Sequence, residues 1–366
     1  MELGFFTMPI HPLGRDWRET LREDQEAFLI ADALGFREAY VGEHVTDLAE
    51  NITSSAMFLA TLAGRIKSMR LGTGTVNLPN IHPAHVAGQI AMLDHLLDGR
   101  FNFGISPGGL LSDAEIFGNL DADRNAMFLE AIEAILRLWT KEAPYDIDGP
   151  TWKISTRRTL MPEIGQGIIA KPLQKPHPPI VVTAVAPFSK GVSAAAARGW
   201  DPISANFLLP KWVATHRKSY EEGCRSGGRA VDFGQWRVAK SIFVADSREV
   251  ARDYALGPKS PYRHYYKSLF TKLVKNGRGN LFKEDPAMPD DTLDFEQVFT
   301  KLAIWGTADE VAEKVLAFRE EVGPFGVLLY AGHDWLDPNL ARRSMTLMAE
   351  QAAPRINRAL ARASAA

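Results

Sequence analysis

The sequence predicts a (β/α)8 barrel, and three observations lead to that fold class. Eight apolar runs of strand length occur along the 366 residues, and nearly all are followed by a helical pattern. The first four strand–helix pairs fit within about 140 residues, a spacing typical of crossover units. Polar residues stand where several runs end, as in barrels whose active site lies at the carboxyl ends of the strands. A doubly wound open sheet is the main alternative, but Gly72-Thr73-Gly74 lacks the third glycine of a dinucleotide-binding fingerprint.

In the first half of the chain, strands alternate with amphipathic helices. Residues 2–8 form a compact apolar run, as expected for a parallel strand buried on both faces. The helix that follows ends at Gly35, a typical helix stop. The same reasoning predicts strands at residues 36–42, 69–76 and 100–105, and helices at residues 17–34, 54–66, 84–97 and 123–139.

The second half continues the alternation. Ser247 is a typical N-cap, and Thr307 with Glu310 forms a capping box. The predicted strands five to eight are residues 180–184, 201–205, 236–244 and 325–330, and the predicted helices are residues 189–198, 212–222, 247–256, 307–321 and 339–362.

Two segments interrupt the pattern. Residues 141–179 are rich in proline and glycine, and we interpret them as an insertion before strand five that carries no helix. Residues 257–294 follow strand seven without a clear period, which predicts a long loop outside the core, either a lid or a disordered surface loop. We expect a single barrel domain over residues 1–366.

Composition narrows the class of protein. A hydrophobic content of 46%, a charged content of 23% and a formal charge of -2 are typical of globular proteins and offer no basic excess for nucleic acid. No apolar run approaches a membrane span, and no secretory leader is apparent, so we expect a cytoplasmic protein. The single cysteine, Cys224, lies in a polar segment and excludes an internal disulfide and a thiolate metal cluster.

His44 is the first candidate for the active site, because it follows Glu43 where strand two ends. The alternative is a core histidine bonded to a backbone carbonyl. We expect Glu43 to orient its neighbours. His333 has a similar position after strand eight, where it is equally an ion-paired surface histidine beside Asp334. The predicted mouth is otherwise uncharged and apolar, which favours a flat ring system, and it includes Met8, Val76, Asn77, Ser106 and Ala184. We predict substrate contacts for Met8, Glu43 and His333, and no metal site.

Three further positions suit a large phosphorylated ligand. In Ser106-Pro107-Gly108-Gly109, the glycines allow close approach of a bulky group. Arg124 begins a helix where it could clamp a phosphate, although a solvent-exposed arginine beside Asp121 and Asp123 is the alternative. Ser189 begins another helix and is equally a phosphate donor or an ordinary N-cap.

The chain resembles the luciferase-like flavin-dependent monooxygenases. The likeness is carried by four stretches, which are residues 35–45, 71–83, 96–105 and 306–311. Residues 43–52 and 331–335 look closest to the branch of limonene and diketocamphane monooxygenases. The resemblance implies a barrel that binds reduced FMN from a separate NAD(P)H:flavin reductase. It also implies reaction with dioxygen through a flavin hydroperoxide, and insertion of one oxygen atom into a small apolar substrate such as a terpenoid, ketone or aldehyde.

The same resemblance assigns roles to residues. His44 matches the active-site histidine, Ser106 stands beside the flavin ring, and Val76 with Asn77 would face it. Gly108 and Ala184 belong to the same cofactor site, and Arg124 and Ser189 match phosphate-binding positions. The likeness also implies a homodimer or higher homo-oligomer, paired through residues 54–66 and 84–97.

The chain differs from luciferase at positions that bind the phosphate of the flavin. Pro107 stands where luciferase has a phosphate-binding arginine, and Val185-Ala186 replaces a Glu-Ser pair. The phosphate must therefore be held differently here. Two alternatives remain open at this point, a deazaflavin-dependent dehydrogenase and a non-catalytic flavin-binding protein. The residues do not choose between hydroxylation, epoxidation and Baeyer-Villiger oxidation.

Overall fold

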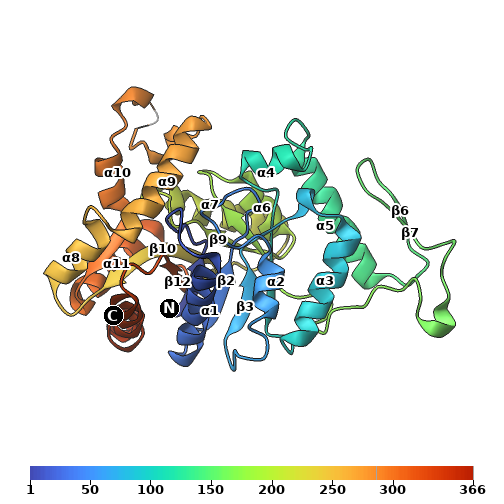
Figure 1. The fold of residues 1–366 in the computed structure, drawn as a ribbon, viewed down its shortest axis with the longest axis horizontal. Helices are drawn as coiled ribbons and strands as arrows, with labels where there is room; N and C mark the ends of the chain where they lie inside the picture. The colour runs from blue at the N-terminus through green and yellow to red at the C-terminus, as the bar shows by residue number, and fades with distance from the viewer. Residues whose placement is uncertain (286, 366) are drawn as a thin grey trace. The chain divides into compact units, whose positions relative to one another are not determined.

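The computed structural model describes residues 1–285 and 287–365, and within them eight parallel strands form a closed barrel, which confirms the predicted fold class. Figure 1 shows the course of the chain. The ring begins with β1 and closes when β12 pairs with β1 in parallel. Its order is β1 (Glu2–Thr7), β2 (Glu38–Val41), β3 (Arg70–Thr73), β5 (Phe101–Ser106), β8 (Ile180–Ala184), β9 (Asp201–Ser204), β10 (Arg237–Val244) and β12 (Val327–Gly332).

Two strands outside this ring extend the sheet. The strand β4 (Val76–Asn77) pairs with β5, and β11 (Ala303–Gly306) pairs with β10. The sequence pattern merged β4 with β3 and missed β11. Short runs of this kind carry too few residues for an alternation to be recognised.

The chain divides into two compact units, and the division runs through β2 and β8. The large unit comprises residues 1–39, 48–51 and 182–366, and the small unit comprises residues 40–47 and 52–181.

The small unit carries four α-helices among its described residues, namely α2 (Ser55–Ala60), α3 (Pro83–Leu96), α4 (Leu111–Ile116) and α5 (Arg124–Thr140). The indole of Trp139 on α5 donates to the carbonyl of Ala87 on α3 (3.1 Å), which joins these two helices. The predicted insertion after α5 contains a hairpin that the sequence did not indicate, β6 (Asp146–Asp148) with β7 (Lys153–Ser155), and in Figure 1 it extends away from α5.

The large unit contains the remaining helices. They are α1 (Trp17–Ala33), α6 (Lys190–Ala197), α7 (Pro210–Ser226), α8 (Arg248–Leu256), α9 (Pro261–Lys275), α10 (Phe295–Leu302), α11 (Ala308–Val322), α12 (Pro338–Leu347) and α13 (Ala353–Ala365). A π-helical turn at Met348–Ala352 joins the last two. Short 3₁₀ turns occur in both units, at Leu78–Asn80, Pro162–Ile164, Phe233–Gln235, Gly279–Phe282 and Asp290–Thr292.

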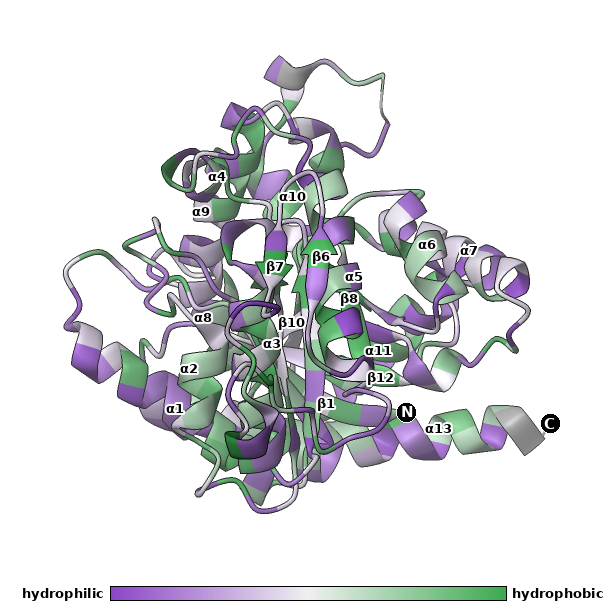
Figure 2. Ribbon diagram, turned by 90° about the vertical axis from the view of Figure 1, so that its right-hand side faces the viewer, coloured by the Kyte–Doolittle hydropathy of each residue, from purple (hydrophilic) through white to green (hydrophobic). Residues whose placement is uncertain are grey.

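Helices α6 and α7 lie side by side in the large unit (Figure 2). Gly223 on α7 permits this approach, because a Cβ atom there would lie 2.3 Å from the carbonyl oxygen of Ser193. Cys224 is buried in the same contact, beside Tyr220.

The predicted helix boundaries are correct where a cap defines them. The Ser247 side chain accepts from the backbone of Val250, and the capping box of Thr307 and Glu310 is complete. Gly35 follows α1 with a φ of 76°, a left-handed conformation that glycine adopts without strain.

The prediction of an irregular loop at residues 257–294 is wrong, because the segment contains α9. Ser260 caps this helix, and Pro261 occupies its first turn. Tyr262, Tyr265 and Tyr266 recur at the helical spacing of three and four residues, and all three are buried. The sequence pattern did not reveal this buried face, because it consists of tyrosines set among basic residues. Helix α9 is therefore part of the core of the large unit.

Candidate active site

In the small unit, the ends of three strands meet through polar side chains. Asn77 on β4 pairs with Ser106 on β5, and the Ser106 hydroxyl donates to the Asn77 side-chain oxygen (2.8 Å). The Asn77 amide donates to the carbonyl of Glu43 (3.3 Å), just beyond the end of β2. The predicted site residues Glu43, Asn77 and Ser106 are therefore close together, and the apolar Val76 is buried beside them.

The Glu43 carboxylate forms hydrogen bonds to neighbouring residues of the protein. It accepts from the backbone and the hydroxyl of Ser55 (2.8 and 2.6 Å), and from the backbone of Asn77 (3.3 Å). Burial raises the pKa of Glu43, while these hydrogen bonds oppose that change. Glu43 thus fixes the first turn of α2 relative to β4, in agreement with its predicted orienting role. The predicted contact with substrate stays a prediction.

His44 lies directly after Glu43 and is partly exposed. Its backbone amide donates to the carbonyl of Ile52 (3.1 Å). The next two residues are held by Asp113 of α4, whose carboxylate accepts from the amides of Val45 and Thr46 (3.2 and 2.8 Å) and from the Thr46 hydroxyl (2.6 Å). Sequence reasoning missed Asp113, because it lies 67 residues beyond Thr46 with no local signal.

The glycine loop after β5 is close to the same cluster. Gly108 has a φ of 82°, and a Cβ atom there would lie 3.6 Å from that of Asn77. Arg124 opens α5, is half-buried, and donates to the Gly108 carbonyl (3.4 Å). The alternative of a fully solvent-exposed arginine is therefore wrong, while a role in binding phosphate stays a prediction.

Two predicted cofactor positions, Ala184 and Ser189, and the predicted substrate contact Met8 belong to the large unit. Ala184 ends β8 and is buried, and Met8 follows β1 and is half-buried. The Ser189 hydroxyl accepts from the backbone of Val192 (3.3 Å), so this residue is the N-cap of α6. That hydrogen bond uses an acceptor lone pair of the oxygen and leaves the hydroxyl proton for other partners.

His333, after β12, is buried between tyrosine rings. Its centroid lies 4.4 Å from those of both Tyr262 and Tyr265, and its Nε2 lies 2.9 Å from the Ser241 hydroxyl. Burial lowers the pKa of His333 to about 3, so the ring is neutral at physiological pH. The interpretation as an ion-paired surface histidine is wrong, because burial excludes it and Asp334 pairs elsewhere.

The three tyrosines of α9 are contacts that the sequence did not indicate. The Tyr266 hydroxyl donates to the Ser241 hydroxyl (2.7 Å), the Tyr265 hydroxyl to the Asn206 side chain (3.2 Å), and the Tyr262 hydroxyl to the Ile242 carbonyl (2.6 Å). Helix α9 is thereby tied to β10 and to Asn206, just beyond the end of β9. Recognising the helix from its cap and its aromatic spacing would have revealed this network.

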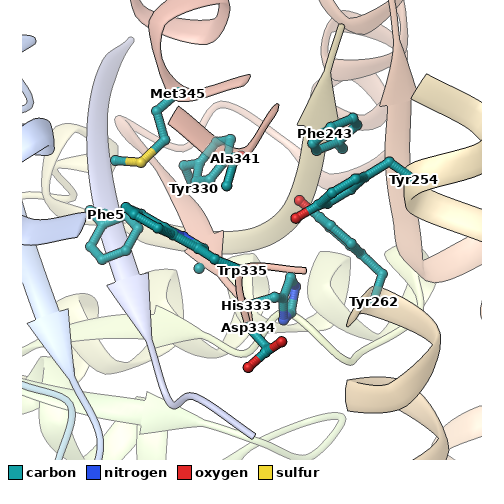
Figure 3. Close-up of a pocket in the computed structure, with 11 residues that line it drawn as sticks. Phe5, Phe243, Tyr254, Tyr262, Tyr330, His333, Asp334, Trp335, Ala341 and Met345 are labelled. Atoms are coloured by element: carbon teal, nitrogen blue, oxygen red, sulfur yellow. The ribbon is translucent and has the colours of Figure 1, made fainter. Parts of the chain in front are cut away.

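A cavity of about 20 Å³ adjoins His333 in the large unit (Figure 3). That volume accommodates about one water molecule, far less than an organic ring system needs. The walls are mainly aromatic and come from six side chains, Phe5, Phe243, Tyr254, Tyr262, Tyr330 and Trp335. The cavity is therefore a packing space beside His333 and not itself a binding site for an organic molecule.

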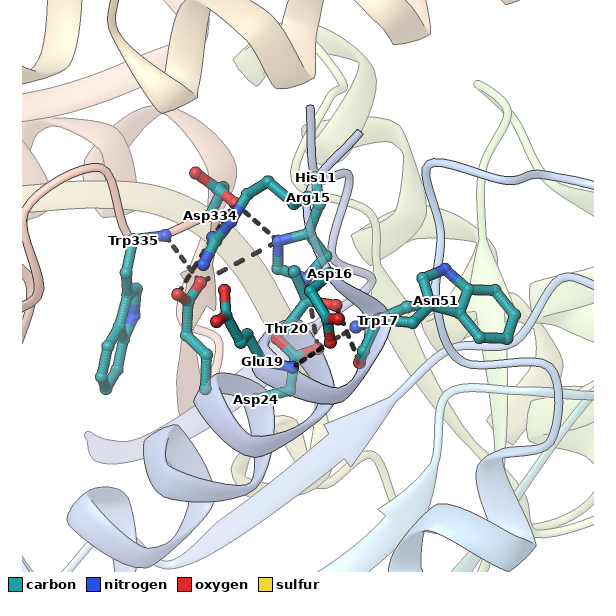
Figure 4. A network of polar contacts seen from close by, with 11 residues as sticks. His11, Arg15, Asp16, Trp17, Glu19, Thr20, Asp24, Asn51, Asp334 and Trp335 are labelled. Carbon is teal, nitrogen blue, oxygen red and sulfur yellow. Dashed lines mark hydrogen bonds and ion pairs between the residues drawn. The ribbon is translucent and has the colours of Figure 1, made fainter. Parts of the chain in front are cut away.

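Asp334 belongs to an ionic network with the loop before α1 (Figure 4). Its carboxylate lies 2.7 Å from His11 Nδ1 and 2.5 Å from the Arg15 guanidinium, and His11 Nε2 lies 3.2 Å from Asp24. Burial alone would lower the pKa of His11, but Asp24 and Asp334 outweigh it and raise the pKa to about 9. Ligand atoms of His11, Glu23 and Asp334 lie within 4.8 Å of one another, yet Arg15 and the protonated His11 already pair with both carboxylates, so we interpret the cluster as an ion network.

Within the described residues, none of the helices combines the length and the hydropathy needed to span a bilayer.

Comparison with known proteins gives a match along nearly the whole chain. The profile of the luciferase-like monooxygenase family matches residues 1–324. The 4-hydroxyprotoasukamycin monooxygenase of Streptomyces nodosus subsp. asukaensis is 33% identical over 98% of this chain and 93% of its own length. The oxygenase component of the flavin-dependent trigonelline monooxygenase of Acinetobacter baylyi is 35% identical, covering 79% of this chain and 78% of its own length.

A solved structure supports the expected branch. It is the oxygenating constituent of the 3,6-diketocamphane monooxygenase of Pseudomonas putida, described as a type II Baeyer-Villiger monooxygenase in complex with FMN. The TM-score is 0.87 at 25% identity, and the match covers 97% of this chain and 98% of the other.

Proposed function

Because the chain belongs to the luciferase-like monooxygenase family, we propose that it is the oxygenase component of a two-component flavin-dependent monooxygenase. It takes reduced FMN and dioxygen and inserts one oxygen atom into a small apolar organic substrate. The observation that carries this proposal is the match along almost the full length to an FMN-bound oxygenating constituent. Bound reduced FMN supplies the two electrons that activate dioxygen.

The residues of the small unit fit a flavin ring. Val76 offers an apolar surface, while Asn77 and Ser106 offer uncharged hydrogen-bonding groups next to it. Gly108 has no side chain to obstruct a bulky ligand. In this proposal Val76, Asn77, Ser106 and Gly108 contact the ring, and Glu43 keeps β4 and α2 in register around them.

His44 is the residue we propose for catalysis. An imidazole can hold or move a proton near neutral pH. Asp113 fixes the backbone after His44, and the Asn77 amide donates to the Glu43 carbonyl before it, so His44 has a defined position. Ala184, Arg124 and Ser189 contribute to cofactor binding, and Met8 and His333 contact the substrate. A neutral, buried His333 can exchange hydrogen bonds without bringing charge to an apolar substrate.

A separate NAD(P)H:flavin reductase supplies the reduced flavin in this proposal. Its support is the trigonelline relative, which is described as an oxygenase component. The sequence also lacks a dinucleotide-binding fingerprint of its own. We further propose that the protein acts in the cytoplasm as a homodimer or higher homo-oligomer.

The test is an anaerobic titration with reduced FMN, followed by ¹⁸O₂ and a panel of apolar ketones, aldehydes and terpenoids. We expect saturable binding of reduced FMN, consumption of dioxygen, and one ¹⁸O atom in a product detected by mass spectrometry. Turnover with a reduced deazaflavin and no use of dioxygen would instead support a dehydrogenase. Flavin binding without turnover of any panel member would support a non-catalytic flavin-binding protein.

The variant His44→Ala tests the proposed catalytic residue. We expect product formation to fall by roughly 10²-fold or more, the usual contribution of a positioned acid or base. The dissociation constant for reduced FMN should stay within about threefold of the parent value, since binding rests on other residues. Equal rates for variant and parent would remove His44 from the mechanism.

A further inference from the structure

Arg278 is a partly buried cation that has no acidic partner among the described residues. It follows α9 in the large unit, and its guanidinium donates to the carbonyl of Val185 (3.3 Å), directly after β8. Burial lowers the pKa of Arg278, and no neighbouring carboxylate opposes that change. The other half-buried arginine of the same segment, Arg263, pairs with Glu296. Arg278 therefore differs from its neighbour in lacking a counter-charge.

A partly buried arginine without a counter-charge is stabilised when it binds an anion. A cation withdrawn from water without a compensating charge destabilises the fold, and a single carbonyl compensates only in part. The guanidinium has five N–H donors arranged to match the oxygens of a phosphate or carboxylate. The hydrogen bond to Val185 uses one of them, so most of its donors are left for a ligand.

The segment that Arg278 contacts is held rigidly. The Ala186 carbonyl accepts from His216 Nε2 (2.8 Å), so His216 Nδ1 has no proton and accepts from the Ser204 hydroxyl (2.9 Å). The Ser204 oxygen in turn accepts from the Trp236 indole (3.0 Å). Burial lowers the pKa of His216 to about 4, so this chain of hydrogen bonds does not change near neutral pH. The carbonyls of Val185 and Ala186 are thus both fixed by side chains.

We propose that Arg278 binds the terminal phosphate of the flavin cofactor at the end of β8. This inference rests on the proposed function. It gives the phosphate a cationic partner that the sequence alone did not suggest. Such a partner is needed because Pro107 stands where luciferase has a phosphate-binding arginine. The fixed carbonyls of Val185 and Ala186 and the Ser189-capped start of α6 border the same strand end. Arg278 would then discriminate FMN from riboflavin, which lacks the phosphate.

The experiment compares anaerobic binding of reduced FMN and reduced riboflavin, measured by calorimetry. The proteins are the parent, Arg278→Gln, Arg278→Lys and the control Arg263→Gln. We expect Arg278→Gln to weaken FMN binding by roughly 10- to 100-fold and to leave riboflavin binding within twofold, as for loss of a charge-assisted pair. Arg278→Lys should restore part of the FMN affinity, and Arg263→Gln should leave the ratio of the two affinities unchanged. Inorganic phosphate should compete with FMN for the parent but not for Arg278→Gln.

Several results would overturn the inference. They are an unchanged FMN affinity in Arg278→Gln, an equal loss for FMN and riboflavin, or the same shift of the affinity ratio in Arg263→Gln. If Arg278→Gln does not fold, the ratio of FMN affinity to riboflavin affinity in Arg278→Lys is compared with that of the parent, and an unchanged ratio overturns the inference. Tight FMN binding with an affinity ratio independent of Arg278 contradicts only this inference. Failure of the parent to bind either flavin contradicts the proposed function as well.

Discussion

The backbone after His44 depends on one buried carboxylate, that of Asp113. Its oxygens accept hydrogen bonds from two consecutive amides and from the Thr46 hydroxyl, and the residue is only 2% exposed. Loss of the carboxylate leaves these partly buried donors to water, which costs less for each group than the about 1–3 kcal/mol of a fully buried donor. Asp113 is thus a positioning residue for the candidate catalytic histidine.

We expect Asp113→Ala to lower kcat by about tenfold while changing the affinity for reduced FMN by less than about threefold, because misplacement affects chemistry more than binding. Stopped-flow turnover and anaerobic titration measure the two quantities separately. Ser112→Ala is the matched control, since Ser112 also contacts Thr46 but leaves the carboxylate in place. A parallel loss of kcat and FMN affinity would mean that Asp113 supports the unit as a whole.

His11 gives the protein a pH-dependent stability. Its pKa rises from 6.5 to about 9 on folding, because Asp24 and Asp334 outweigh the cost of burial. A group with a raised pKa stabilises the folded state fully below its unfolded pKa, and this contribution disappears as the pH rises through about 9. The groups that face His11 are Glu23, Asp24, Asp334 and the cation Arg15.

We therefore expect the free energy of unfolding to fall by on the order of 3 kcal/mol between about pH 6 and pH 10 in the parent relative to His11→Gln. Urea denaturation across this range measures the difference. The variant should lose this part of the pH dependence while keeping the rest. Identical pH profiles would show that His11 is not protonated in the folded protein.

At the scale of single residues, the sequence predicted which strand ends carry polar groups but not what those groups do. Glu43, Asn77 and Ser106 could be placed together because parallel strands end at the same edge. The roles of Asp113 and Arg278 depend on contacts across 67 and 93 residues, and no local pattern encodes such pairings. His333 was misjudged because the tyrosines that bury it come from an unrecognised helix.

Among the elements, helix α9 lies where the sequence predicted a long loop after β10. Three buried tyrosines join α9 to β10 and to Asn206 after β9, so the helix packs as part of the large unit. Deleting residues 257–294 would expose the core of that unit, which makes deletion a poor test of lid function. A single hydroxyl is the better probe.

Tyr266→Phe removes the hydroxyl that donates to Ser241 and keeps the ring. We expect a loss of about 1–2 kcal/mol in the free energy of unfolding, because the buried Ser241 hydroxyl loses a partner. Flavin affinity should not change, while the KM for substrate should rise if Ser241 orients His333. Tyr254→Phe is a matched control, since Tyr254 lies on α8 outside this network. Equal stability of Tyr266→Phe and the parent would contradict an anchoring role for α9.

The elements themselves were predictable wherever caps and apolar periodicity coincide, as at Ser247 and Thr307. They were not predictable where strands shrink to two or four residues, as in β4 and β11, or where tyrosine provides the apolar face of a helix. In those places tertiary packing decides the conformation, and local propensity carries little information.

For the whole molecule, the buried ion pair of Glu38 and Arg237 is a feature that the strand pattern did not indicate. Two hydrogen bonds of 2.6 and 3.1 Å join these side chains, and they are 0% and 3% exposed. Glu38 begins β2 and Arg237 begins β10, so the pair lies at the starts of strands, away from the carboxyl ends that carry the candidate site. We therefore expect the pair to contribute to stability and not to the proposed activity.

We expect Arg237→Ala to lower the free energy of unfolding by about 3–5 kcal/mol, because it removes the cation that compensates the buried Glu38 carboxylate. The double variant Glu38→Leu with Arg237→Met should be less destabilised than Arg237→Ala, since it removes both charges and keeps most of the volume. Urea unfolding followed by tryptophan fluorescence measures all three proteins. FMN affinity of the folded double variant should match the parent, because the pair is remote from the proposed cofactor residues. A double variant less stable than Arg237→Ala would mean that the attraction between the two charges holds the starts of β2 and β10 together.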